Sequence, residues 1–219
     1  MRKYIKLLSQ LVVLFGVSVC HAGSYEDFFT AIKRDNPGAV QTLLGRGFDA
    51  NILNPQGVHG LLLALQEPSP KVAAILIRWP GTNVEFRTAK DESPLMLASL
   101  RGQLDLVRKL IERGADVNKT GWAPLHYAAT SGQVQIMELL LEHHAYIDAE
   151  SPNGTTPLMM AALYGTPAAV KLLLDAGADA ALRNQLGMTA IEFANKANRR
   201  DSAELIAAAR RNLQPRGKW

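Results

Sequence analysis

The chain has 219 residues, of which 47% are hydrophobic and 20% are charged, with 24 basic and 20 acidic side chains. This length suits one domain or one array of repeats, and the composition can bury a core, which argues against a disordered chain. Ala and Leu dominate over β-branched residues, which favours helices.

The first 22 residues have the pattern of a secretory signal peptide. A positively charged start precedes a mostly apolar run over residues 7–19, and small residues then stand three before and one before a cut, in Cys20-His21-Ala22. This order of charge, apolar run and small residues is typical of an exported precursor. We therefore expect cleavage after Ala22 and a periplasmic or secreted product.

Two alternatives to a cleaved leader remain open. A membrane anchor needs about 20 consecutive apolar residues, and this run is shorter. A lipid on Cys20 would make the protein a lipoprotein, but the residue before that cysteine is Val19, where such proteins usually have a small residue. After cleavage we expect no membrane association.

Leader removal changes both the charge and the cysteine count. The leader holds three of the 24 basic residues and no acidic one, so the remainder carries a net charge of +1, and nucleic acid is not an expected partner. Residues 214–219 form a basic tail, which we interpret as a solvated end. Cys20 is the only cysteine, so the mature chain has neither a disulfide nor a thiol nucleophile and depends on its core.

A repeated three-residue pattern sets the organisation of the chain. It recurs at steps of 30 and 33 residues, followed by a weaker copy after a further 33: Ser93-Pro94-Leu95, Ala123-Pro124-Leu125, Thr156-Pro157-Leu158 and Thr189-Ala190-Ile191. Ser or Thr can cap the start of a helix, and Pro fits the first helical position because no N–H partner is needed there. Each copy therefore predicts the start of a helix.

The residues after each copy predict a second helix. A Gly or Asn follows eight positions after the central residue, at Gly102, Gly132, Gly165 and Asn198, where a left-handed residue would stop the first helix. An apolar stripe at i, i+3 and i+4 comes next, as in Val107-Leu110-Ile111. The second helix has ended by Gly114, His144 and Gly177 in three units. We count six such units: about 24–51, 52–85, 86–118, 119–148, 149–181 and 182–213.

These residues resemble the ankyrin repeat, whose hallmark is T-P-L-H-x-A-A with G-A-D later, and the resemblance covers residues 23–213. It implies an all-α solenoid of about six helix-turn-helix units joined by β-hairpin-like finger loops. It also implies a binding module without catalysis or a cofactor, and we expect a monomer. The polar residues of the last unit suit a solvent-facing end cap.

In the family, the residue after the TPLH histidine and the residues after A-A face the concave side. Transferred to this chain, and together with Trp122 from a finger three residues shorter than the later ones, they predict a partner-binding surface: Leu97, Leu100, Trp122, Tyr127, Met160, Leu163 and Tyr164. An apolar run in exposed positions usually marks a binding site. Trp122 could instead fill the space left by the short finger, and His126 stands at the structural histidine of the family.

We find no catalytic or metal-binding pattern. His143-His144 has no acidic or cysteine partner at ligand spacing, so no metal is predicted. A hydrolase is the rival from another class, but the sequence has no catalytic motif to support it. We expect an exported scaffold that binds a protein. A secreted effector that binds a host protein, and an accessory or protective subunit of another exported enzyme, remain alternatives.

Overall fold

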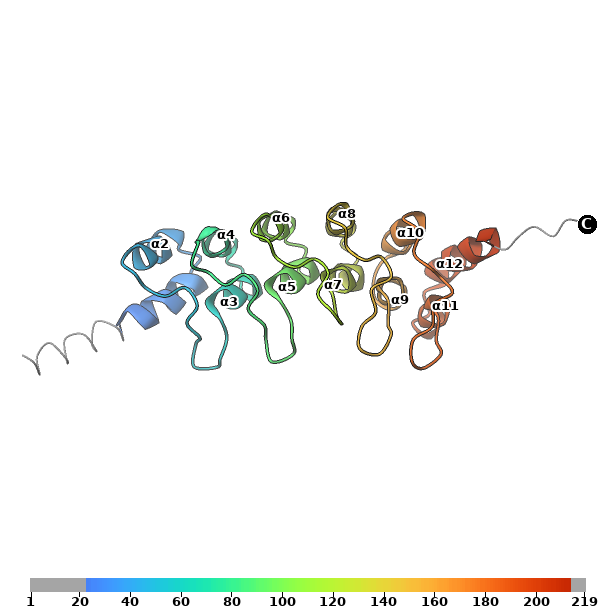
Figure 1. Ribbon diagram of the computed structural model, residues 1–219, viewed down its shortest axis with the longest axis horizontal. Coiled ribbons are helices and arrows are strands. Elements are labelled where there is room, and N and C mark those ends of the chain that lie inside the picture. The colour runs from blue at the N-terminus through green and yellow to red at the C-terminus, as the bar shows by residue number, and fades with distance from the viewer. Residues whose placement is uncertain (1–22, 214–219) are drawn as a thin grey trace, which may run out of the picture. The chain divides into compact units, whose positions relative to one another are not determined.

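The computed structural model describes residues 23–213, and most of these residues lie in short helices (Figure 1). The predicted leader and basic tail lie outside this part of the chain. The described residues fall into two compact units, of which the first ends at Asn83 and the second begins at Val84. The first unit holds a helix over residues 23–33, α2 (Pro37–Gly45), α3 (Gly60–Gln66) and α4 (Pro70–Arg78).

The second unit continues the alternation of inner and outer helices. Its inner helices are α5 (Pro94–Leu100), α7 (Pro124–Ser131), α9 (Pro157–Leu163) and α11 (Ala190–Lys196). Its outer helices are α6 (Leu104–Glu112), α8 (Val134–Glu142), α10 (Pro167–Asp175) and α12 (Arg200–Leu213). Each inner helix packs against the next inner helix, and each outer helix packs against the inner helix of its own unit. The predicted helix-turn-helix order is confirmed.

The inner helices begin where the repeated pattern predicts, but not all by the same bonds. The hydroxyls of Ser93 and Thr156 accept from the backbone N–H three residues later, as expected of caps. The Thr189 hydroxyl does not cap α11, so that expectation is wrong; the Glu192 carboxylate accepts the Thr189 backbone N–H instead. Both arrangements satisfy an N–H group that the first helical turn leaves without a partner.

The inner helices stop in two different ways. Gly102 and Gly132 adopt left-handed conformations with φ of 71° and 67°, and Asn198 does so with φ of 56°. Gly165 is an exception, because its φ is not positive. A Cβ atom at Gly165 would lie 2.4 Å from the Ala129 carbonyl oxygen, so glycine is required there by close packing of two inner helices.

The core follows the predicted apolar stripes. Val107 and Leu110 of α6 and Val170 and Leu173 of α10 are fully buried. In the first unit, the pattern has Gly60 where three later repeats have Pro, and a Cβ atom there would lie 2.8 Å from the Phe28 ring. The aromatic residue of the first helix therefore occupies the space that a side chain at this position would need.

A side chain from the end of one repeat accepts a backbone N–H of the next. In the first unit the Asn51 Oδ1 accepts from Asn83 at 2.7 Å. In the second unit Glu85 accepts from Asp116, Asn118 from Tyr146 and Asp148 from Asp179, at 2.7–3.1 Å. These bonds fix the spacing of neighbouring repeats along the edge that carries the loops.

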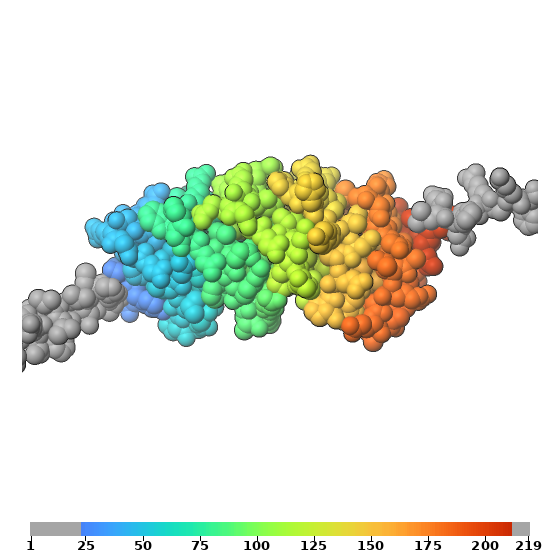
Figure 2. Space-filling model, viewed as in Figure 1, coloured from blue at the N-terminus to red at the C-terminus, as the bar shows by residue number. Residues whose placement is uncertain are grey.

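The loops between an outer helix and the next inner helix form projecting fingers, which in the second unit are residues 84–93, 116–123, 146–156 and 179–189 (Figure 1). These fingers contain no regular strand. Within residues 23–213, β pairing is limited to one isolated antiparallel bridge, between Leu53 and His59 of the first unit. Eleven residues join α6 to α7, whereas fourteen join α8 to α9. The finger of residues 116–123 is accordingly short (Figure 1), and the outline of the surface is notched between the longer fingers on either side (Figure 2).

Candidate functional site

An apolar hollow of about 290 Å³ lies beside the short finger. Leu100, the last residue of α5, lines it together with Tyr127 and Thr130 of α7, Met160 of α9 and Trp122 of the finger. Three successive inner helices therefore each contribute at least one lining residue. Four of the seven residues predicted for partner binding meet here, and we call this feature the aromatic hollow.

Two polar groups that border the aromatic hollow are already bonded within the chain. The Thr130 hydroxyl donates to the carbonyl of His126 at 2.7 Å. The Tyr127 hydroxyl donates to the Glu92 carboxylate at 3.3 Å, and burial together with the charge of Glu92 raises the pKa of Tyr127 to about 12. The inner surface of the hollow is consequently suited to apolar contacts.

Trp122 both packs on the fold and lines the hollow. Its ring meets the His126 ring edge-on, with centroids 5.3 Å apart and an interplanar angle of 75°. The contact with His126 agrees with the alternative in which Trp122 fills the space left by the short finger, and its role in partner binding stays a prediction. Its finger runs close to the next one, since a Cβ atom added at Gly121 would lie 3.5 Å from Pro152.

His126 is a buried structural residue. Its Nδ1 accepts the backbone N–H of Ala123 at 3.1 Å, and its Nε2 lies 2.9 Å from the Thr155 carbonyl oxygen of the following finger. Only a neutral ring with the proton on Nε2 can make both bonds. Burial lowers the pKa of His126, which favours that neutral form.

The remaining predicted residues do not line the hollow. Leu97 is only 6% exposed, so the expectation of an exposed side chain there is wrong. Leu163 is half-buried at the end of α9, and Tyr164 directly after it is 57% exposed. The backbone carbonyls of Tyr164 and Gly165 accept from the Arg199 guanidinium.

Sequence reasoning missed two residues that belong to the site. Glu92 holds the Tyr127 hydroxyl, and Thr88 donates its own hydroxyl to the same carboxylate at 3.1 Å. Both lie on the finger of residues 84–93, which is more than 30 positions before Tyr127 in the sequence. No local pattern links them, although the 33-residue step does bring that finger next to α7.

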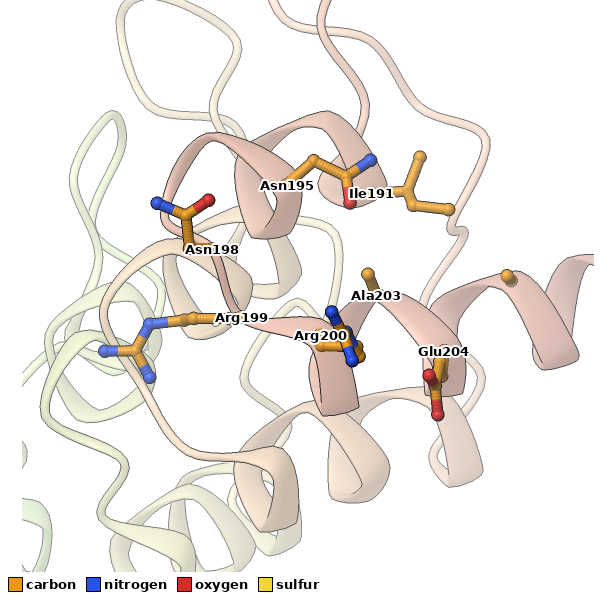
Figure 3. Close-up of a pocket in the computed structure, with 8 residues that line it drawn as sticks. Ile191, Asn195, Asn198, Arg199, Arg200, Ala203 and Glu204 are labelled. Carbon is orange, nitrogen blue, oxygen red and sulfur yellow. The ribbon is translucent and has the colours of Figure 1, made fainter.

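A second hollow, of about 450 Å³, lies at the C-terminal end between α11 and α12 (Figure 3). Ile191 and Asn195 lie on one side and Arg200, Ala203 and Glu204 on the other. Five of its eight lining residues are polar, as expected of the last repeat, which has to face solvent. Arg199 at its edge is already bonded to the preceding repeat.

The described part of the chain holds neither a metal-binding cluster nor a membrane-spanning helix. Residues 23–213 bring no three His, Cys, Asp or Glu side chains together in a way that could hold a metal ion. In the same residues, no helix is both long and apolar enough to cross a membrane. His143 and His144 are exposed, and His144 has a left-handed φ of 64° just after α8 ends.

Relatives of known sequence share the repeats. The chain is 28% identical over 176 residues to mouse neurogenic locus notch homolog protein 1, and 38% identical over 92 residues to human 2-5A-dependent ribonuclease. These alignments cover 72% and 40% of this chain but only 7% and 12% of the relatives. Both relatives are therefore far longer than the segment that this chain matches.

Solved structures match over more of their length. An ankyrin repeat domain from Acinetobacter baumannii has a TM-score of 0.72 and 25% identity, with 83% of this chain and 96% of that one aligned. A chain from the complex of a predatory endopeptidase of Bdellovibrio bacteriovorus with an immunity protein has a TM-score of 0.71 and 25% identity, with 83% and 97% aligned.

The family model described as ankyrin repeats in three copies matches residues 28–120, 61–151 and 146–215. These ranges together span nearly all of the helical part of the chain. With the repeated helix pairs, the projecting fingers and the matched structures, they show that this chain belongs to the ankyrin repeat family.

Proposed function

We propose that this chain is an exported scaffold that binds a protein partner on the surface of its inner helices and catalyses no reaction itself. The observation that carries the proposal is the aromatic hollow, where Trp122, Tyr127 and Met160 leave apolar surface open in a fold that does not need it for stacking. Aromatic residues in such a place are typical hot spots of protein interfaces. Export rests on the pattern of residues 1–22.

A protective subunit for an exported enzyme is the second candidate. It is supported by the structural neighbour from the endopeptidase–immunity protein complex, which aligns with 83% of this chain. In that reading the partner is a peptidase made by the same cell.

Site-directed photo-crosslinking in cells would identify the partner. A photoreactive phenylalanine analogue at Thr130, on the edge of the hollow, should capture it, and mass spectrometry would tell a peptidase from other proteins. The same analogue at Glu138, which is exposed on outer helix α8, provides the matched control. Capture only from Glu138 would place the binding surface on the outer helices and reject the proposal.

Affinity measurements with that partner would then test individual residues. Tyr127→Ala and Tyr164→Ala should each weaken binding at least about tenfold, because truncating a hot-spot aromatic costs about 2 kcal/mol or more. Glu138→Lys and Lys171→Glu should leave the affinity nearly unchanged, since both side chains are exposed on outer helices. The reverse pattern would contradict the assignment.

A further inference from the structure

The aromatic hollow is sized for one large side chain. Its volume of about 290 Å³ lies just below the range of about 300–1,000 Å³ that small-molecule sites occupy. The hydroxyls of Tyr127 and Thr130 both donate hydrogen bonds to acceptors within the chain. An apolar occupant of the hollow would therefore leave neither hydroxyl without a partner.

The short finger leaves the hollow open at the side. The finger of residues 116–123 is three residues shorter than the next one, and it projects less far than residues 84–93 and 146–156 on either side (Figure 1). An extended loop can therefore approach between the two longer fingers. A rigid helix lying across the fingertips would be held away from Tyr127.

Two carboxylates of the finger of residues 84–93, Asp91 and Glu92, lie close enough to Tyr127 to raise its pKa. Asp91 is 67% exposed and pairs with Lys119, which is only 10% exposed. In the described part of the chain the partners of the Glu92 carboxylate are the Tyr127 and Thr88 hydroxyls. A carboxylate has about four acceptor positions, so Glu92 can still accept a bond from a cation.

The fingers as a group are acidic as well. In the second unit they carry seven acidic residues and four basic ones. The acidic residues are Glu85, Asp91, Glu92, Asp116, Asp148, Glu150 and Asp179, and the basic ones are Arg87, Lys90, Lys119 and Arg183. Potentials of opposite sign speed association and select partners.

From the apolar hollow, its side opening and its acidic border, we propose that the partner inserts a basic loop whose one bulky apolar side chain enters the aromatic hollow. A neighbouring Lys or Arg of that loop pairs with Glu92. This inference rests on the proposed binding function and adds the chemistry of the partner to it. Lys119 does not compete for Glu92, because it is paired with Asp91.

Three short peptides test this chemistry without the partner. The probes are acetylated and amidated Lys-Phe-Lys, Glu-Phe-Glu and Lys-Ala-Lys, titrated into the ¹⁵N-labelled protein. The Lys-Phe-Lys peptide should shift the Trp122 indole N–H signal and the amides of Tyr127 and Met160. Its dissociation constant should be at least about fivefold lower than that of either other peptide.

Variants of one carboxylate complete the test. Glu92→Gln should remove most of the preference for Lys-Phe-Lys over Glu-Phe-Glu, whereas Glu150→Gln on the finger of residues 146–156 should preserve it. If Lys-Ala-Lys bound as tightly as Lys-Phe-Lys, the inferred apolar side chain in the hollow would be wrong. If Glu-Phe-Glu bound as tightly as Lys-Phe-Lys, the inferred basic neighbour would be wrong. If no peptide shifts these signals while Tyr127→Ala still weakens the real partner, the inference fails and the proposed function stands.

Discussion

The Tyr127 hydroxyl donates a hydrogen bond of 3.3 Å to the Glu92 carboxylate, across 35 positions of the sequence. This bond ties the finger of residues 84–93 to inner helix α7 and fixes one wall of the aromatic hollow. Glu92 is held from its other side by Thr88 at 3.1 Å. A residue that sets the charge at the entrance thus also sets the orientation of the aromatic ring.

Glu92→Gln should lower the pKa of Tyr127 from about 12 towards the ordinary value of about 10 without reaching it. Burial is the larger cause of the raised pKa and remains in the variant, whereas the repulsion between tyrosinate and carboxylate is lost. The measurement is an NMR titration of tyrosine labelled with ¹³C at Cζ. Glu150→Gln is the control, and an unchanged pKa in Glu92→Gln would refute the coupling.

Gly165→Ala should destabilise the protein more than Gly114→Ala. A Cβ atom at Gly165 would meet the Ala129 carbonyl oxygen at 2.4 Å and the Ala161 Cα at 2.9 Å, both of them backbone atoms that cannot rotate away. Overpacking of this kind costs up to about 3 kcal/mol. Gly114 has a φ of 82° but open space around it, so alanine there adds only the strain of a left-handed residue, about 1 kcal/mol.

Urea titrations of both variants would compare these losses. The two variants distinguish two reasons for glycine after a helix. Gly165 is needed because a side chain would have no space, and Gly114 is needed because the backbone is left-handed. An equal loss at the two positions would mean that α7 and α9 can move apart, and that the close approach at Gly165 is not required.

Stability should fall as the pH drops from about 7 to 5.5, because His126 must remain neutral. Its pKa is lowered in the folded protein, so below the ordinary value of about 6.5 the unfolded chain binds more protons than the folded one. His59 adds to the same slope, since burial lowers its pKa to about 4 and its Nδ1 accepts the Leu61 N–H. This contribution is fully present above pH 7 and is lost towards acid.

Melting curves at several pH values would show the effect. His126→Gln should flatten the dependence between pH 7 and 5.5, even if the variant is less stable at every pH. His143→Gln should keep the slope of the parent protein, because that side chain is exposed. A slope that survives removal of both His126 and His59 would assign the effect to other groups.

The sequence predicts the helices well because their signals are local. Pro94 and Pro157 start helices, and Val107 and Leu110 are buried, as cap and stripe require. The exposure of single residues is less predictable. Leu97 and Tyr127 occupy equivalent positions, yet Leu97 is buried and Tyr127 is half-exposed, because exposure depends on the neighbouring repeat and its finger.

Interactions between repeats were the least predictable part. The Glu92–Tyr127 bond joins residues in two different repeats, and the Asn118 amide holds Tyr146 and His144 across a distance of more than 25 positions. Gly165 was expected to be left-handed, like Gly132, but the close approach of Ala129 explains it instead. A periodic pattern gives the step between repeats, and the side-chain contacts across each step depend on packing.

The mature protein should begin at Gly23. The prediction rests on the charged start, the apolar run over residues 7–19 and Cys20-His21-Ala22, whose small residues suit a signal peptidase. N-terminal sequencing of protein recovered from the periplasm or the medium would establish the first residue. Intact Met1 on protein from the cytoplasm would contradict export. A lipid on Cys20, visible as added mass, would show instead that the scaffold is anchored to a membrane and presents its hollow there. Ala22→Arg provides a test of the cut itself, because a large charged residue before the cleaved bond should leave the precursor unprocessed.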